Sequence, residues 1–213
     1  MSAKRFIAIA GNIGVGKSTL TALLSERLGW KPFFEAVDEN PYLADFYQDM
    51  ERWSFHSQIF FLSRRLQHLR QILDYAGSAI QDRTVYEDAE VFAQNLARQG
   101  NMTEREYRSY CELYEAMIPF IPPPDLLVYL QASLPKLLHQ INQRDRAYEK
   151  AIDPLYLQQL NDLYDAWIEG FTHCPVLTVP ADNMDFLNHP EHLDLLVAKI
   201  MDKLQGREIV VFP

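Results

Sequence analysis

Apolar residues follow two patterns that alternate along the chain. Short unbroken apolar runs are typical of buried strands, and longer stretches with apolar residues three or four positions apart are typical of amphipathic helices. The runs predict strands at 5–10, 31–36, 79–81, 125–131 and 175–180. The periodic stretches predict helices at 17–28, 51–75, 85–98, 103–117, 133–146, 154–168 and 190–204, an irregular helical segment at 41–47, and a tail at 208–213 that either pairs as an edge strand or lies loose.

This order of strands and helices predicts an α/β fold. Strands connected through helices pair in parallel with right-handed crossovers, so we expect a five-stranded parallel sheet flanked by helices, in a single domain spanning 1–213. Ligands bind such sheets beyond the carboxyl ends of the strands. The polar side chains expected at that edge are those of Glu35, Asp82, Arg83, Gln131 and Asp182.

A glycine-rich segment follows the first predicted strand and opens a helix, the context that gives the pattern G-x-x-x-x-G-K-[ST] its meaning. Glycine lets the backbone curl so that several N–H groups face one phosphate, and the helix N-terminus adds partial positive charge. Lys17 is expected to reach the terminal phosphates and Ser18 to ligate Mg²⁺. The predicted nucleoside triphosphate site consists of Gly11, Asn12, Ile13, Gly14, Val15, Gly16, Lys17, Ser18 and Thr19.

Composition narrows the class of protein. The net charge of −9 argues against a nucleic-acid or anionic-membrane surface, and the apolar runs are too short to span a bilayer. Cys111 and Cys174 lie far apart without metal-ligand spacing, which indicates reduced thiols, and the six histidines show no ligand or triad spacing. We therefore expect a cytoplasmic enzyme whose substrates are small molecules.

The phosphate loop alone is compatible with kinases, GTPases, motor ATPases and regulators. The chain lacks the Asn-Lys-x-Asp sequence that specifies guanine in GTPases, and its length suits a small kinase. Arg144 and Arg146 lie on a segment that we expect to form a small helical lid, at about 140–152, over the transferred phosphoryl group. These features favour a P-loop kinase fold, with ATP or another triphosphate as donor and Mg²⁺ as cofactor.

Five segments, in order, carry a more specific resemblance. They are Gly11–Thr19; Phe34-Glu35-Ala36; Glu51-Arg52-Trp53-Ser54-Phe55 with Gln58 and Leu62-Ser63-Arg64; Asp82-Arg83-Thr84-Val85-Tyr86 with Asp88; and Arg144-Asp145-Arg146 with Glu149. In these segments the chain resembles the deoxyribonucleoside kinases, the deoxycytidine, deoxyguanosine and deoxyadenosine kinases, over nearly its whole length. The resemblance implies transfer of a γ-phosphoryl group to the 5′-hydroxyl of a 2′-deoxyribonucleoside, for nucleotide salvage.

The resemblance also implies catalytic roles. Glu35, at the end of the second predicted strand, would be the general base that takes the proton of the 5′-hydroxyl; the competing interpretation is a solvated loop carboxylate. Asp82 would lie near Mg²⁺, and Arg83 would orient the 5′-oxygen and Glu35. Asp82 and Thr84 are mild variants of the family pattern.

For the nucleoside, the resemblance implies that Gln58 reads the base edge and that Arg64 and Asp88 contact its far side. The combination of Arg64 with Asp88 is similar to the purine and deoxycytidine members, so purine deoxyribonucleosides are the favoured substrates. A plain structural salt bridge between Arg64 and Asp88 is the alternative. Further contacts are implied for Phe55 and Phe92, which would flank the base unless they belong to the core, and for Tyr47 and Glu149, which would hold the sugar 3′-hydroxyl.

On the donor side, the resemblance implies that Arg144 and Arg146 form the lid over the phosphates. The family often has another arginine one turn earlier, where this chain has Gln140. Asp185 and Phe186 belong to a segment, 182–186, that resembles the loop against the adenine of ATP. A homodimer formed through long helices is a further implication.

Two other functions are weighed against this interpretation. A nucleoside monophosphate kinase, such as a thymidylate kinase, would need cations around the acceptor, and the acidic Glu35 suits a neutral hydroxyl better. A non-catalytic switch driven by ATP would need neither a base-reading Gln58 nor a catalytic carboxylate. Replacing Glu35 by alanine separates a kinase from a switch, because a kinase would lose turnover whereas a switch would survive the change.

Overall fold

The computed structural model describes residues 4–37, 39–144, 146, 149, 152–186 and 188–205. Its centre is a parallel sheet of five strands in the order β2-β3-β1-β4-β5. The expectation of a five-stranded parallel α/β sheet is confirmed. The strands are β1 (Phe6–Gly11), β2 (Lys31–Phe33), β3 (Ala79–Asp82), β4 (Leu126–Gln131) and β5 (Val176–Pro180).

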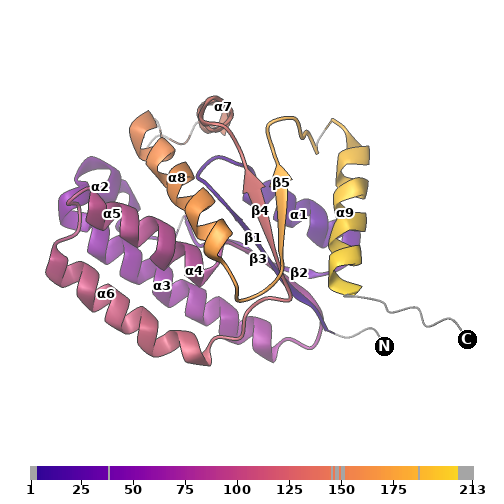
Figure 1. The fold of residues 1–213 in the computed structure, drawn as a ribbon, viewed down its shortest axis with the longest axis horizontal. Helices are drawn as coiled ribbons and strands as arrows, with labels where there is room; N and C mark the ends of the chain where they lie inside the picture. Colours follow the sequence, from indigo (N-terminus) through magenta and orange to yellow (C-terminus); the bar gives the residue numbers. More distant parts are fainter. Residues whose placement is uncertain are drawn as a thin grey trace, which may run out of the picture.

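Helices cover both faces of this sheet, with α1 and α9 on one face and α3, α5, α6 and α8 on the other (Figure 1). The α-helices of the described residues are α1 (Lys17–Leu28), α2 (Leu43–Gln48), α3 (Met50–Asp74), α4 (Val85–Glu87), α5 (Gln94–Arg98), α6 (Glu104–Met117), α7 (Leu134–Arg144), α8 (Pro154–Gly170) and α9 (Pro190–Gln205). A π-helical segment, η1 (Asp88–Ala93), lies between α4 and α5, and a 3₁₀ turn, η2 (Ile118–Phe120), follows α6.

The side chains of β1 alternate between two hydrophobic clusters, as the period of a strand requires. Ile7 and Ile9 pack with residues of α1 and α9, and Ala8 and Ala10 pack with residues of the helices on the opposite face. Every residue of β1 is buried, which explains why this strand appears in the sequence as an unbroken apolar run.

The register of the strands brings the predicted site segments together. Ile9 of β1 pairs with Asp82 at the end of β3, and the Arg83 N–H donates to the Ile9 carbonyl at 2.9 Å. Residues that follow β3 therefore lie beside the segment that follows β1. β2 ends at Phe33 rather than at 36, so Glu35 belongs to the loop after the strand.

Some other expectations differ from the structure in detail. The single helix expected at 85–98 is interrupted by η1, a wider-turned segment of a kind that is frequent at functional sites. The expected lid includes 145, 147, 148, 150 and 151, and the expected tail is 208–213; these residues lie outside the described part. In the portion that the structure describes, no helix is long and apolar enough to cross a membrane.

Candidate active site

A cavity of about 570 Å³ lies beyond the carboxyl ends of the strands, where ligands bind parallel sheets. Its wall combines the phosphate loop, the loop after β2, α3, α7 and the segment after β5. Predicted site residues along it are Ile13, Gly14, Val15, Gly16, Lys17, Ser18, Thr19, Glu35, Tyr47, Gln58, Arg83, Asp88, Phe92, Arg144, Arg146, Glu149, Asp185 and Phe186. Gly11, Asn12, Phe55, Arg64 and Asp82 are absent from this wall.

The phosphate loop has the conformation that its glycines predict. Gly14 and Gly16 have φ values of 86° and 100°, and a Cβ on Gly14 would lie 2.7 Å from the Ile141 side chain. Lys17 is buried and its Nζ donates to the Asn12 carbonyl at 3.0 Å. Burial, followed by the charge of Arg83, lowers the pKa of Lys17 to about 8. The negative charge of a bound phosphate would stabilise the protonated form of Lys17.

Ser18 and Asp82, the two residues expected to lie at the metal, contact each other. The Ser18 hydroxyl donates to Asp82 Oδ2 at 2.5 Å, and the residue Asp82 is 1% exposed. The other carboxylate oxygen, Oδ1, is buried without a hydrogen-bond partner among the described residues. Mg²⁺ prefers a carboxylate with other oxygen ligands and several waters. This donor pair fits the predicted Mg²⁺ ligands.

Glu35 lies between two guanidinium groups. Its Oε1 is 2.5 Å from Arg65 Nη2 and 2.9 Å from Arg83 Nε. Burial alone raises the pKa of Glu35, but the charges of Arg83, Arg65 and Lys17 and the hydrogen bond from Arg65 outweigh it and lower the pKa to about 2. Glu35 is therefore ionised and fixed in direction, not the freely solvated carboxylate of the competing interpretation.

Another side of the cavity is formed by α3 and η1. Gln58 is 4% exposed, and its Oε1 has no partner within the described part of the chain. A buried amide oxygen without a partner is costly unless a ligand satisfies it. Phe92 faces the same cavity, and the Arg83 guanidinium lies 4.3 Å from its ring centroid. Phe55 instead packs against the core and against His56, so the core interpretation holds for this aromatic residue.

Arg144 and Arg146, the two arginines expected in the lid, form ion pairs with Glu149. Arg144, at the end of α7, donates twice to the Glu149 carboxylate, with both distances 2.6 Å, and Arg146 Nη1 lies 3.4 Å from Oε1. Glu149 is 4% exposed. The residue expected to hold the sugar and the two expected to hold the phosphates therefore form one cluster in this structure.

The family model described as deoxynucleoside kinase matches residues 7–205. The chain belongs to the deoxynucleoside kinase family. The resemblance in the sequence is thereby confirmed, and the protein is an ATP-dependent deoxynucleoside kinase.

Curated relatives cover almost the whole kinase. A deoxyadenosine/deoxycytidine kinase of Bacillus subtilis is 43% identical over 95% of this chain and 94% of its own. A deoxyguanosine kinase of the same organism is 33% identical over 95% of this chain and 99% of its own. Among solved structures, a deoxyadenosine kinase from M. mycoides with bound dATP superposes with a TM-score of 0.83 at 30% identity, covering 92% of this chain and 99% of that one.

One sequence expectation about the kinase is wrong by a single residue. Arg64, expected to contact the base together with Asp88, is absent from the cavity wall, and its Nη2 pairs with Glu39 at 3.1 Å rather than with Asp88. Arg65 takes this place, with Nε 3.0 Å from Asp88 Oδ2. Successive helical residues point about 100° apart, and Arg65 lies two turns after Gln58 on the same face. The helical spacing between Gln58 and Arg65 is the feature of the sequence that indicates Arg65 rather than Arg64 for this position.

Two buried residues behind Arg83 were also not predicted. The Glu87 carboxylate lies 3.5 Å from Arg83 Nη1, accepts the Thr84 N–H at 2.8 Å and accepts the Gly11 N–H at 3.2 Å. The Tyr164 hydroxyl accepts from Arg83 Nη1 at 2.7 Å. The sequence Thr84-x-x-Glu87 is a capping box, a signal that could have identified Glu87. Tyr164 shares an apolar helix face with core residues and carries no such signal.

α7 contributes a polar stripe to the cavity wall. Lys136, Gln140 and Gln143 recur at helical spacing and line the cavity together with the phosphate loop. Gln140 Oε1 is buried without a partner among the described residues and would lie 4.0 Å from a Cβ placed on Gly16. Lys136 was not predicted, although its spacing from Gln140 in the sequence points to the same helix face.

Proposed function

We propose that this kinase transfers the γ-phosphoryl group of Mg²⁺-bound ATP to the 5′-hydroxyl of a purine deoxyribonucleoside, deoxyadenosine or deoxyguanosine. The observation that carries this proposal is the position of Glu35. Its carboxylate is held by Arg65 and Arg83 on the wall of the cavity that also contains the phosphate loop and Gln58. An oriented carboxylate near the γ-phosphate can accept the proton of a neutral hydroxyl.

The phosphate loop and Lys17 hold the donor in this proposal. Ser18 and Asp82 would hold Mg²⁺, which supplies neutralisation of the phosphate charge that develops during transfer. Arg83 faces the region between Glu35 and the loop and stabilises charge on the transferred group. Asp185 and Phe186, on the cavity wall after β5, would contact the donor base.

Glu35 first orients the 5′-hydroxyl of the nucleoside. With a pKa of about 2 it is a weak base, so it does not deprotonate the hydroxyl before transfer begins. In a loose phosphoryl-transfer transition state, the attacking oxygen becomes acidic as its bond to phosphorus forms. The carboxylate therefore accepts a hydrogen bond from the 5′-hydroxyl, aims it at phosphorus and receives the proton late.

The nucleoside pocket favours a base with both donor and acceptor groups. Gln58 offers an amide to the base edge, and Asp88, also on the cavity wall, is fixed by a buried ion pair with Arg65. Relatives named for deoxyadenosine and for deoxyguanosine support the purine preference. Tyr47 and Glu149 would hold the sugar 3′-hydroxyl, so lid closure would couple nucleoside binding to Arg144 and Arg146.

A homodimer is part of the proposal and rests on the family resemblance. Light scattering on the purified protein measures its mass directly. A mass corresponding to two chains at micromolar concentration supports the dimer, and a single-chain mass across the concentration range contradicts it.

The test of function is transfer from labelled ATP to a panel of deoxyribonucleosides and their monophosphates, with Mg²⁺ present and then removed by chelation. We expect labelled monophosphate from deoxyadenosine or deoxyguanosine, lost without Mg²⁺ and lost in Glu35→Ala. Product formed only from monophosphates would assign a monophosphate kinase. Bound ATP with no product from any acceptor, and with binding unchanged in Glu35→Ala, would assign a switch.

A further inference from the structure

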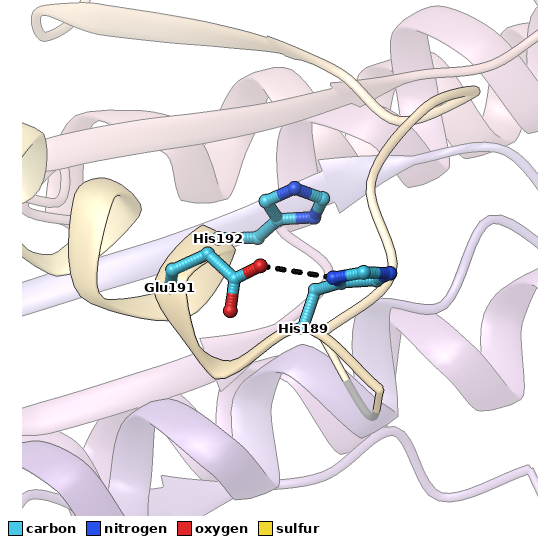
Figure 2. Close-up of side chains that lie close together, drawn as sticks. All are labelled: His189, Glu191 and His192. Carbon is cyan, nitrogen blue, oxygen red and sulfur yellow. Dashed lines mark hydrogen bonds and ion pairs between the residues drawn. The ribbon is translucent and has the colours of Figure 1, made fainter.

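Three side chains at the start of α9, those of His189, Glu191 and His192, lie close together (Figure 2). His189 Nδ1 lies 2.9 Å from Glu191 Oε1, and the rings of His189 and His192 are stacked with centroids 5.1 Å apart. One ligand atom from each residue lies within 4.8 Å of the others. The sequence expectation that no histidines have ligand spacing is therefore wrong for this pair, which lies three residues apart.

We propose that His189, Glu191 and His192 bind a divalent transition metal such as Zn²⁺. Two imidazoles and one carboxylate are a donor set that Zn²⁺, Ni²⁺ and Cu²⁺ accept, with water completing the coordination. His189 and Glu191 are exposed, so a metal ion and its waters have access. Asp185 adds negative charge nearby in the sequence, opposing the partial positive charge of the helix N-terminus.

Metal binding would compete with a hydrogen bond of His192. The Asp185 N–H donates to His192 Nδ1 at 3.2 Å, so this nitrogen carries a lone pair and the proton lies on Nε2. A metal at Nδ1 would take the same lone pair. A metal at Nε2 would force the proton onto Nδ1, where it would face the Asp185 N–H. Either mode of coordination removes the hydrogen bond.

That hydrogen bond belongs to the loop on the cavity wall. The Asp185 carboxylate accepts from the Asn188 N–H at 3.0 Å and from its side-chain amide at 2.7 Å, and both residues line the cavity. Metal at the His189–Glu191–His192 cluster would therefore loosen this loop. The consequence for ATP rests on the proposed function, which places the donor base there, whereas the metal site itself does not.

Calorimetric titration with Zn²⁺, in excess Mg²⁺ and with any purification tag removed, tests the site. We expect one Zn²⁺ per chain in the unmodified protein and in His56→Ala, a control that removes an exposed histidine on α3. His189→Ala and His192→Ala each remove a ligand and should weaken binding by about tenfold or more, the smallest loss usual when even a supporting partner of a ligand is removed. Unchanged affinity in both variants, or no saturable binding, would overturn the proposal.

Hydrogen exchange of the Asp185 amide, measured by nuclear magnetic resonance without nucleotide, tests the competition. Zn²⁺ should speed exchange in the unmodified protein and have no effect in His189→Ala, which keeps the His192 contact. His192→Ala should exchange fast without metal. Zn²⁺ binding with an unchanged Asp185 amide would overturn the competition. Because neither measurement uses nucleotide or turnover, a failure here is distinguishable from a failure of the kinase assay.

Discussion

The buried carboxylate of Glu87 accepts a hydrogen bond from the N–H of Gly11, 3.2 Å away. This contact connects the helix after β3 to the first residue of the phosphate loop. The Tyr164 hydroxyl completes the connection, since it lies 2.7 Å from Glu87 Oε2 and 2.8 Å from the Gly11 carbonyl. The guanidinium of Arg83 and the phosphate loop are thus held by one buried network.

Tyr164→Phe should separate positioning from binding. The change keeps the ring but leaves Arg83 without one buried partner, at a cost of about 1–3 kcal/mol in the free energy of unfolding. We expect kcat to fall about tenfold or more while the KM for the nucleoside changes little, because Tyr164 does not line the cavity. Steady-state kinetics and thermal unfolding measure both effects.

Tyr75→Phe is the matched control, because Tyr75 lies at the surface after α3. A merely structural role for Tyr164 predicts the same unfolding loss with unchanged kcat in the fraction that remains folded. That result would contradict the positioning of Arg83 through the network.

Local signals in the sequence predicted the part of the site that is built locally. The phosphate loop and the five strands each depend on neighbouring residues, and the structure contains all of them. Arg65 was missed because the inward face of α3 is selected by packing against η1 and the loop after β2. Tyr164 was missed because its partners lie 77 and 153 residues away along the chain.

Arg64 and Arg65 provide a matched pair for the nucleoside site. Arg65→Ala leaves the buried Asp88 and Glu35 without their shared cation, and breaking one side of a buried pair costs about 3–5 kcal/mol. We expect kcat/KM for the deoxyribonucleoside to fall more than about a hundredfold. Arg64→Ala should stay within about threefold, because an exposed ion pair contributes at most about 1 kcal/mol.

Circular dichroism and thermal unfolding show whether Arg65→Ala remains folded. If it does not, Arg65→Lys, which keeps the charge but loses the forked geometry, provides the comparison. A larger loss of kcat/KM in Arg64→Ala than in either Arg65 variant would contradict the assignment of Arg65 to the site.

Asp88 should give the nucleoside site a pH dependence. Burial raises the pKa of Asp88 to about 6, against the opposing charges of Arg65 and Arg83. Below this pH the side chain is neutral and loses its ion pair with Arg65. We therefore expect the KM for the deoxyribonucleoside to rise as pH falls through about 6, while Glu35, with its pKa of about 2, stays ionised.

The raised pKa of Asp88 also makes the stability of the protein depend on pH. The folded Asp88 binds its proton more tightly than the unfolded side chain, so its contribution to the free energy of unfolding is present below about pH 4 and is lost as pH rises through about 6. KM measured from pH 5 to 8 in the unmodified enzyme and in Asp88→Asn checks the assignment. An unchanged KM transition near pH 6 in Asp88→Asn would mean that another group titrates.

Lys136 should act as a phosphate cation from α7. Its side chain lines the cavity together with the phosphate loop, on the helix face that also carries Gln140. One charge acting at about 4 Å through water contributes about 1 kcal/mol, so Lys136→Ala should raise the KM for ATP about fivefold and leave the KM for the nucleoside unchanged. Lys199→Ala, on α9 and outside the cavity wall, is the matched control.

Gln140→Arg tests the same face of α7 by adding a cation instead of removing one. A cation one turn after Lys136 would replace an amide whose oxygen is buried without a partner among the described residues, and would face Gly16 of the loop. We expect Gln140→Arg to lower the KM for ATP. The decrease should be larger when Gln140→Arg is introduced into Lys136→Ala than into the unmodified enzyme, because the two cations repel each other when both are present. An additive response, or one confined to the nucleoside KM, would place Lys136 outside the donor site.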